Sequence, residues 1–280
     1  MQILRSVSDM KASSRVARDE GSVLGFVPTM GYLHEGHLNL VRMAGELVEQ
    51  VVVSVFVNPT QFGPLEDLDR YPRDFERDRA LLEEAGADVV FAPEVSDMYP
   101  EGFATAVHIE RMGEKLCGAY RPGHFDGVCT VVAKLFEIVR PQLAVFGQKD
   151  GQQAAIIERM VEDLNMDVEI VRGPTVREDD GLAMSSRNSY LTDEERQQAP
   201  VLNAALLYAR ELYEAGETDA DRVLAEIRSM IESKPAAEVQ YISAVDWKTL
   251  EERRRLGAGT MIALAVYFGK TRLIDNIVLP

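Results

Sequence analysis

Short apolar runs and longer amphipathic segments alternate along the first two thirds of the chain. Five runs rich in apolar residues predict buried strands: Val23–Val27, Val51–Val57, Asp88–Ala92, Leu143–Phe146 and Val168–Arg172. Four amphipathic segments predict helices between and after these strands: Leu38–Val48, Arg73–Glu84, Val128–Val139 and Ala154–Leu164. Strands that alternate with helices favour parallel pairing, because a parallel neighbour needs a long crossover connection. The pattern therefore predicts an α/β domain with a parallel sheet.

Beyond Asn188 the order of the pattern changes. Thr192 and Glu195 have the spacing of a capping box, which predicts a helix from there to about Ala215. A second helix and three strands are predicted at Asp219–Ser233, Val239–Val245, Met261–Phe268 and Arg272–Val278. Helices followed by strands are typical of an α+β domain. We therefore expect two domains, residues 1–175 and the smaller 176–280.

The first predicted strand runs through Pro28 and Gly31 into the first predicted helix. A helix N-terminus has a positive dipole end and unpaired backbone N–H groups, so this junction suits an anion such as a phosphate. His34 and His37, two of only four histidines in the chain, lie there three residues apart. We expect both imidazoles to face the same anion. Two structural histidines or a metal-binding pair are the alternatives, although no second cluster with metal-ligand spacing accompanies them.

Polar residues also follow other predicted strands at their carboxyl ends, where parallel sheets bind ligands. Gln61 lies in the loop after the second strand. Lys149 lies in the turn after the fourth strand, where its ammonium can reach a phosphate. Arg121 and His124 precede a helix in a turn-rich stretch, which predicts a second position suited to an anion.

Residues 173–188 show little periodicity, and a stretch of this length predicts a functional loop rather than a spacer. Ser185, Ser186 and Arg187 near its end offer two hydroxyls and a guanidinium, which suit phosphate oxygens. By contrast, the charged residues of Arg73–Glu84 are expected to form a solvated helix face.

Charge and composition exclude several classes of partner. The chain has 46 acidic and 30 basic residues and a formal net charge of −16, which disfavours nonspecific binding to nucleic acid or an anionic membrane. Two cysteines are too few for a disulfide framework, and residues 1–14 lack a signal-peptide core. No apolar run reaches the ~18 residues of a membrane span. We expect a cytoplasmic protein with no nucleic-acid or membrane partner.

The string Pro28-Thr29-Met30-Gly31 followed by His34-Glu35-Gly36-His37 resembles the pantothenate synthetase family of the His-x-Gly-His nucleotidyl-transfer superfamily. Further similar segments extend over nearly the whole chain: Phe56–Phe62, Arg121–Gly127, Met184–Arg187 and Gly269–Asn276. The resemblance implies a Rossmann-like domain that binds the nucleotide and pantoate, a C-terminal lid domain, and a homodimer.

The resemblance also implies the residues of the site. The catalytic residues would be His37, His34 and Lys149. The residues that bind ATP would be Met30, Gly31, Tyr32, Leu33, His34, Glu35, Gly36, His37, Gly147, Gln148, Lys149, Asp150, Val176, Met184, Ser185, Ser186 and Arg187. The residues at the small substrate would be Gln61, Gln153, Arg121 and His124. Mg²⁺ would accompany ATP, with its protein ligands left open.

The implied activity is the ATP-dependent ligation of pantoate with beta-alanine to pantothenate, a coenzyme A precursor. Pantoate would attack the α-phosphorus of ATP to form pantoyl adenylate and pyrophosphate, and beta-alanine would then displace AMP. Two other functions remain open. A nucleotidylyltransferase would act on a phosphorylated small molecule, but it needs a basic pocket where this chain has Gln61 and Gln153. A nucleotide-sensing module would bind without chemistry.

Two positions depart from the family pattern. Gln148 stands where the family usually has Glu, and Gly151 stands where it usually has Tyr. If Gly151 only adds backbone freedom, ordering the loop on ATP costs about 0.5 to 1 kcal/mol more than with a side chain. Gly151→Tyr is then expected to tighten ATP binding. If Gly151 instead has a positive φ, a side chain there would be strained and the substitution would weaken ATP binding.

Overall fold

The computed structural model describes residues 1–64 and 66–280, which form two compact units. The first unit consists of residues 1–114, 118–147 and 156–174, and the second of residues 115–117, 148–155 and 175–280. Two short pieces from the N-terminal part of the chain therefore belong to the second unit, and no sequence pattern indicates this. Two separate domains that divide between residues 175 and 176, the second acting as a lid, stay a prediction.

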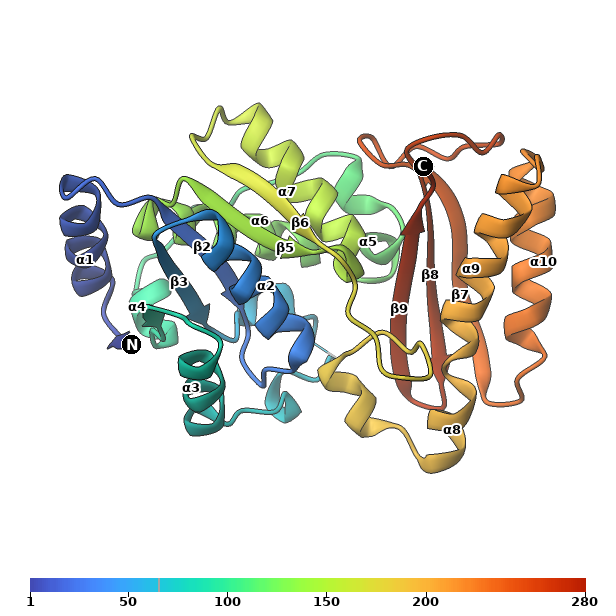
Figure 1. Ribbon diagram of the computed structural model, residues 1–280, viewed down its shortest axis with the longest axis horizontal. Coiled ribbons are helices and arrows are strands. Elements are labelled where there is room, and N and C mark those ends of the chain that lie inside the picture. The colour runs from blue at the N-terminus through green and yellow to red at the C-terminus, as the bar shows by residue number, and fades with distance from the viewer. Residues whose placement is uncertain (65) are drawn as a thin grey trace. The chain divides into compact units, whose positions relative to one another are not determined.

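The first unit contains a six-stranded sheet in the order β1-β4-β3-β2-β5-β6 (Figure 1), and every strand pair in it is parallel. The strands are β1 (Gln2–Leu4), β2 (Leu24–Thr29), β3 (Gln50–Val55), β4 (Val89–Phe91), β5 (Leu143–Gly147) and β6 (Glu169–Gly173). The order reverses between β2 and β5, and parallel sheets bind ligands beyond the carboxyl ends of strands at such a point. The parallel α/β fold predicted from the sequence is confirmed.

Helices cover both faces of this sheet. The helices up to β6 are α1 (Val7–Asp19), α2 (Glu35–Leu47), α3 (Phe75–Glu84), α4 (Val95–Met98), α5 (Cys117–Tyr120), α6 (His124–Val139) and α7 (Gly151–Asp163). Val27 of β2 packs in a core cluster with Leu38 of α2, whereas the ring of its neighbour Phe26 lies 6.3 Å from that of Phe136 in α6. Because successive strand residues point to opposite faces, α2 and α6 lie on opposite sides of the sheet.

The second unit contains an antiparallel sheet in the order β7-β8-β9. Its elements are α8 (Asp193–Gln198), α9 (Val201–Glu214), α10 (Ala220–Glu232), β7 (Ala237–Asp246), β8 (Thr260–Phe268) and β9 (Thr271–Val278). Leu206 of α9 and Ile227 of α10 are buried in one apolar cluster with Leu264 of β8. Helices packed beside an antiparallel sheet confirm the predicted α+β class (Figure 1).

The structure corrects several predicted bounds. The single helix predicted from Thr192 to Ala215 is wrong, because Pro200 has no backbone N–H and separates α8 from α9.

Sequence reasoning also missed β1 and α1. The buried residues of α1 are Met10, Ser14 and Ala17, and because two of these are small the apolar period is weak. Helices α2, α6 and α7 begin three or four residues earlier than predicted, because their first turns are polar or glycine-rich.

Candidate active site

The turn between β2 and α2 has a left-handed backbone. Gly31 has φ +81° and Tyr32 has φ +50°. Glycine adopts such angles freely, whereas tyrosine needs support from its surroundings. The Thr29 hydroxyl supplies part of it, because it donates to the Ser54 carbonyl at 2.7 Å and accepts from the Gly31 amide at 3.2 Å. The end of β2 is thereby tied to β3 before the chain turns.

Asp78 of α3 supports the same turn. Its carboxylate accepts hydrogen bonds from the amides of Tyr32 and Leu33, both at 2.7 Å. The residue is 1% exposed, and this burial raises the pKa of its carboxyl against the opposing effect of the two amide bonds. The expectation of a solvated charged face on this helix is wrong for Asp78. Its position one helical turn before the buried Leu82 places it on the apolar stripe, a signal that the sequence contained.

His34 and His37 cap helix α2. Nδ1 of His34 accepts from the Gly36 amide at 3.2 Å, and Nδ1 of His37 accepts from the His34 amide at 3.4 Å. The result is a capping box built from two imidazoles, whose ring centroids lie 4.1 Å apart. The expectation that unpaired amides at this helix end receive the anion needs correction, because the imidazoles bind two of those amides.

The capping bonds define which nitrogen of each ring can donate. A ring nitrogen that accepts a hydrogen bond carries no proton, so the neutral forms of His34 and His37 are protonated at Nε2. Each ring therefore offers an Nε2–H donor, and the pair lies together as its spacing predicts. Two adjacent donors at the positive end of a helix are suited to negative charge that develops on a phosphoryl group.

Glu35, between the two histidines, is turned toward another partner. It is exposed and forms an ion pair with Arg42, and the hydrogen bond from Arg42 is the main cause that lowers the pKa of its carboxyl. This ion pair offsets the negative charge of Glu35 beside the imidazoles.

Gln61 is buried in the loop after β3. Its side-chain oxygen accepts from Nδ2 of Asn58 at 3.0 Å, and its Nε2 lies 3.2 Å from Sδ of Met30. Asn58 is itself held, because its Oδ1 accepts from the Tyr99 hydroxyl at 2.7 Å. The Gln61 amide thus has a fixed orientation beside the turn that carries His34. Sequence reasoning missed Asn58 as the residue that orients it.

Arg121 and His124 form the next layer behind Gln61. Nδ1 of His124 lies 2.7 Å from the Gln61 carbonyl, and Nη1 of Arg121 lies 3.0 Å from Nε2 of His124. Arg121 can only donate, so His124 accepts at Nε2 and donates at Nδ1. Arg121 also forms an ion pair with Glu66, and although burial opposes it, this contact lowers the pKa of Glu66. The anion expected beside Arg121 is therefore a carboxylate of the protein itself.

Helix α6 approaches the Gln61 loop at Gly127. A Cβ atom at this position would lie 2.4 Å from the carbonyl oxygen of Thr60. The Gly127 carbonyl accepts a hydrogen bond from Asn58 Nδ2 at 3.1 Å. Glycine is thus required here by a close backbone contact.

In the second unit, Asn276 of β9 holds the loop of Gln148 and Lys149. Its Nδ2 donates to the carbonyls of both residues at 2.9 Å, and its Oδ1 accepts from Nε2 of Gln148 at 2.7 Å. A glutamate at position 148 could not donate that last bond unless protonated, so the departure from the family pattern has a local reason. Lys149 itself has a weaker side-chain contact, 3.5 Å from its Nζ to Oδ1 of Asp150.

The structure contradicts the expectation that Gly151 merely adds backbone freedom. The residue is buried, and a Cβ atom there would lie 2.9 Å from both Oδ1 of Asn276 and Sδ of Met261. Glycine at this position therefore lets α7 begin against β9, and a side chain would displace the residue that holds the Lys149 loop. The side chain of the neighbouring Gln153 is half-buried and makes no hydrogen bond within the described residues.

Residues 176–184 form a hairpin, and a 3₁₀ turn follows it at Ser186–Tyr190. The Met184 amide donates to the Val176 carbonyl at 3.0 Å, and Arg177 forms a bidentate ion pair with the buried Asp275 at 2.6 and 3.1 Å. Ser185 caps the following 3₁₀ turn by accepting from the Arg187 amide at 3.3 Å. Sequence reasoning missed Asp275, which lies next to Asn276 on β9. One short segment of β9 therefore anchors both loops of the second unit.

The predicted site residues divide between the two units. The first unit holds Met30–His37, Gln61, Arg121, His124 and Gly147, and the second holds Gln148, Lys149, Asp150, Gln153, Val176 and Met184–Arg187. Within the described part of the chain, no group of three His, Cys, Asp or Glu side chains could hold a metal ion. The helices of that part include none with the length and apolarity to cross a membrane.

Comparisons with known proteins agree over the whole chain. The family model described as pantoate-beta-alanine ligase matches residues 2–278. The chain is 56% identical to the pantothenate synthetase of Heliobacterium modesticaldum and 54% identical to that of Acetivibrio thermocellus, over 99% of this chain and of each relative. The crystal structure of pantothenate synthetase from Thermus thermophilus is similar with a TM-score of 0.94 and 49% identity, over 100% of both chains. A pantoate-beta-alanine ligase from Francisella tularensis, complexed with beta-gamma ATP and beta-alanine, has a TM-score of 0.79 and 34% identity over 99% of this chain and 97% of its own.

Proposed function

Because this chain belongs to the pantoate-beta-alanine ligase family, we propose that it condenses pantoate with beta-alanine in a reaction driven by ATP. A carboxylate is a poor acylating agent, so it must first be activated. A pantoate carboxylate oxygen attacks the α-phosphorus, and the bond to the β-phosphate oxygen breaks, which gives pantoyl adenylate and pyrophosphate. The beta-alanine amine then attacks the acyl carbon, loses a proton and releases AMP.

One observation of the fold carries this proposal. The Gln61 amide lies 3.2 Å from Met30, in the turn that presents the two Nε2–H donors of His34 and His37. A neutral amide suits the hydroxyls of pantoate, and the imidazole donors suit the phosphoryl group that its carboxylate attacks. Pantoate and the reacting phosphorus would thereby lie next to each other, near the point between β2 and β5 where the strand order reverses.

The roles of the remaining residues follow from their chemistry. We assign His34, His37 and Lys149 to the charge that develops on the transferring phosphoryl group. The other nucleotide contacts would come from the rest of the residues that the family resemblance implies: Met30, Gly31, Tyr32, Leu33, Glu35, Gly36, Gly147, Gln148, Asp150, Val176, Met184, Ser185, Ser186 and Arg187. Gln153, whose half-buried side chain makes no hydrogen bond within the described residues, would bind pantoate as Gln61 would. Arg121 and His124 would act through the Gln61 loop that they hold.

Mg²⁺ would enter with the nucleotide. It typically keeps several waters and is bound by substrate phosphates with one or two carboxylates. The exposed carboxylate of Asp150, next to Lys149, is the carboxylate that we propose to help hold it. The ion would neutralise phosphate charge during the transfer.

We also propose that the protein works in the reducing cytoplasm and forms a homodimer. Cys117 and Cys129 are both unpaired and buried, which fits the cytoplasm. Sedimentation velocity would test the homodimer, which predicts twice the mass of 31.2 kDa.

The stoichiometry of the products tests the function. With pantoate, beta-alanine and ATP, we expect one AMP and one pyrophosphate for each pantothenate formed. Oxygen-18 in the pantoate carboxylate should appear in AMP, because that oxygen forms the bond to phosphorus. ADP and inorganic phosphate as products, or turnover with a phosphorylated alcohol in place of pantoate, would instead indicate acyl phosphate chemistry or a nucleotidylyltransferase.

A further inference from the structure

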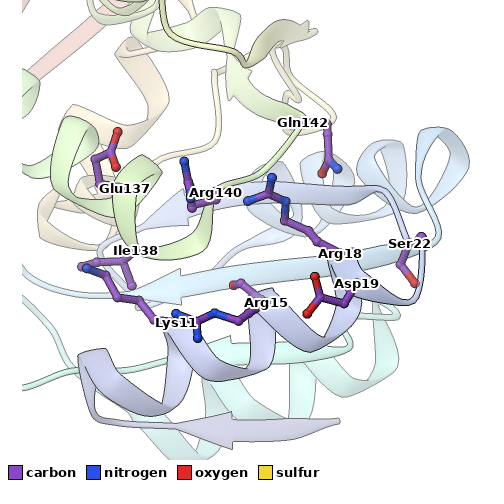
Figure 2. Close-up of a pocket in the computed structure, with 11 residues that line it drawn as sticks. Lys11, Arg15, Arg18, Asp19, Ser22, Glu137, Ile138, Arg140 and Gln142 are labelled. Atoms are coloured by element: carbon purple, nitrogen blue, oxygen red, sulfur yellow. The ribbon is translucent and has the colours of Figure 1, made fainter.

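The first unit has a cavity at the amino ends of its central strands β2 and β5. The cavity has a volume of about 680 Å³ and is lined by residues from α1, from the end of α6 and from the segments that precede β2 and β5 (Figure 2). Ser22 and Gln142 belong to these segments, at the amino ends of the two strands. His34 and Gln61 follow carboxyl ends of strands. The cavity is therefore separate from the proposed active site.

Four basic side chains line this cavity. Lys11, Arg15 and Arg18 lie on one face of α1 at helical spacing, and Arg140 follows the last residue of α6 (Figure 2). All four are exposed, and within residues 1–64 and 66–280 none of them forms an ion pair. The two acidic residues of the lining, Asp19 and Glu137, do not neutralise them. A cavity with a net charge of +2 is unexpected on a chain whose net charge is −16.

Helix dipoles explain only part of this cluster. Arg18 and Arg140 lie at the C-terminal ends of α1 and α6, where a cation stabilises the helix. Lys11 and Arg15 lie earlier in α1, outside its last turn, and the dipole effect falls off within that turn. Their placement toward the same cavity needs another cause.

Two further observations point to a ligand. Arg140 has φ +50°, a left-handed position after a helix that Gly or Asn would occupy at lower strain, so its guanidinium is retained at some cost. The hydroxyl of Ser14 is buried in the lining and has no hydrogen-bond partner within the described residues. Buried hydroxyls are normally paired.

We propose that this cavity binds a small polyanion that carries a diphosphate or triphosphate group. Its volume lies within the ~300–1,000 Å³ of small-molecule sites. Guanidinium groups bind phosphate oxygens in bidentate geometry, and cations from two helices match several negative charges in a row better than a single carboxylate. Free polyphosphate and the polyphosphate chain of a nucleotide share this chemistry.

Calorimetric titration with inorganic triphosphate tests the proposal, and titration with uridine triphosphate shows whether a nucleoside is tolerated. Arg15→Ser combined with Arg140→Asn removes two guanidinium groups while asparagine tolerates the left-handed backbone. We expect this double variant to weaken triphosphate binding at least ~10-fold. Arg222→Ser with Arg228→Ser on α10, an equal change of charge, should leave it within about 2-fold. Circular dichroism would show that the variants are folded, and Lys11→Ser with Arg18→Ser repeats the test if the first pair does not fold.

A variant of the proposed active site separates the two locations. Lys149→Ala should leave the affinity of the cavity between α1 and α6 for triphosphate within about 2-fold, and should weaken only triphosphate binding at the proposed active site. Binding lost in Lys149→Ala but retained in the double variant would overturn the proposal, as would a wild-type chain that binds no triphosphate. A double variant that changes the sedimentation coefficient but not triphosphate binding would assign the basic cluster to contact between copies and would also overturn it.

Discussion

In the first unit, the side chains that we assign to pantoate and to the reacting phosphorus rest on buried polar partners, whereas in the second unit the corresponding groups are held mainly through their backbone. Asn58 and His124 are buried and fix the Gln61 loop, and Asp78 fixes the turn before His34. In the second unit, Asn276 holds the carbonyls of Gln148 and Lys149, but among the described residues the Lys149 ammonium has only a 3.5 Å contact with Asp150.

The two units thus meet different requirements: the groups that bind pantoate need a fixed position, whereas the Lys149 ammonium must be available to a phosphate. A site for a neutral, hydroxyl-bearing part of an acid gains from fixed amides, because each misplaced hydrogen bond lowers affinity. A cation for a charged phosphate gains from few internal partners, because a strong ion pair within the protein would compete with the ligand. Substitution of the buried supporting residues in the first unit should therefore lower stability, whereas substitution of Lys149 in the second unit should lower turnover alone.

The largest effect is expected for Asp78→Ala. It leaves the amides of Tyr32 and Leu33 buried without an acceptor, which costs about 1–3 kcal/mol for each. We expect the free energy of unfolding in urea to fall by about 2–6 kcal/mol and activity to fall with it. Glu76→Ala, an exposed position on the same helix, is the matched control. A loss below about 1 kcal/mol would contradict this account, because the turn would then not depend on Asp78.

Lys149→Ala tests the second unit. The adenylation rate should fall by ~10² or more, because a cation beside the transferring phosphoryl group is lost, while the melting temperature stays within about 2 °C. Lys248→Ala, an exposed lysine of the same unit, should change neither quantity. Quench-flow measurement of AMP formation and calorimetry provide the two readouts. A strongly lowered melting temperature with the rate retained would make Lys149 a structural residue.

Gly151→Tyr is expected to weaken ATP binding, the reverse of the outcome that the sequence suggests. The new side chain must displace Asn276 and Met261, and an overpacking cost of about 1 kcal/mol or more corresponds to ~5-fold or more in the dissociation constant. Gly45→Ala on α2, where a Cβ atom meets nothing closer than 3.8 Å, is the control. Tighter ATP binding in the tyrosine variant, measured by calorimetry, would show that the loop has the freedom that these contacts deny.

The smallest effect concerns Glu66. Because its folded pKa is lowered, its contribution to stability is present above the unfolded value of about 4.3 and is lost as pH falls through the folded value. The contribution should not exceed about 1 kcal/mol, since the carboxylate is 24% exposed. Urea unfolding at pH 6 and below pH 4 should therefore show a slightly smaller pH dependence in Glu66→Gln than in the wild type. An unchanged dependence would mean that the Arg121 ion pair adds no stability.

Local signals predicted much of the fold and part of the site. Strands β2 to β5 of the first unit are short runs rich in apolar residues, and the His34 and His37 pair lies in one short motif, so both could be predicted from neighbouring residues. Asp78 was missed because its partners are backbone amides 45 and 46 residues away, and a charged residue among charges suggests solvent. Asn276 was missed for the same reason, because it contacts residues 127 and 128 positions away.

Composition can also hide an element or a contact. Helix α1 buries Ser14 and Ala17, which carry too little apolar surface to show a period. The role of Gly151 depends on the space left by Asn276 and Met261, and a sequence shows the missing side chain but not the atoms that take its place.

Exchange of labelled pyrophosphate into ATP tests the central claim most directly. If the first unit holds pantoate ready for attack on the α-phosphorus, the wild type should exchange pyrophosphate in the presence of pantoate and in the absence of beta-alanine, because adenylation needs no amine. Gln61→Ala should slow this exchange by ~10-fold or more at low pantoate concentration and less when pantoate is raised. Exchange that requires beta-alanine, or that proceeds without pantoate, would contradict the account.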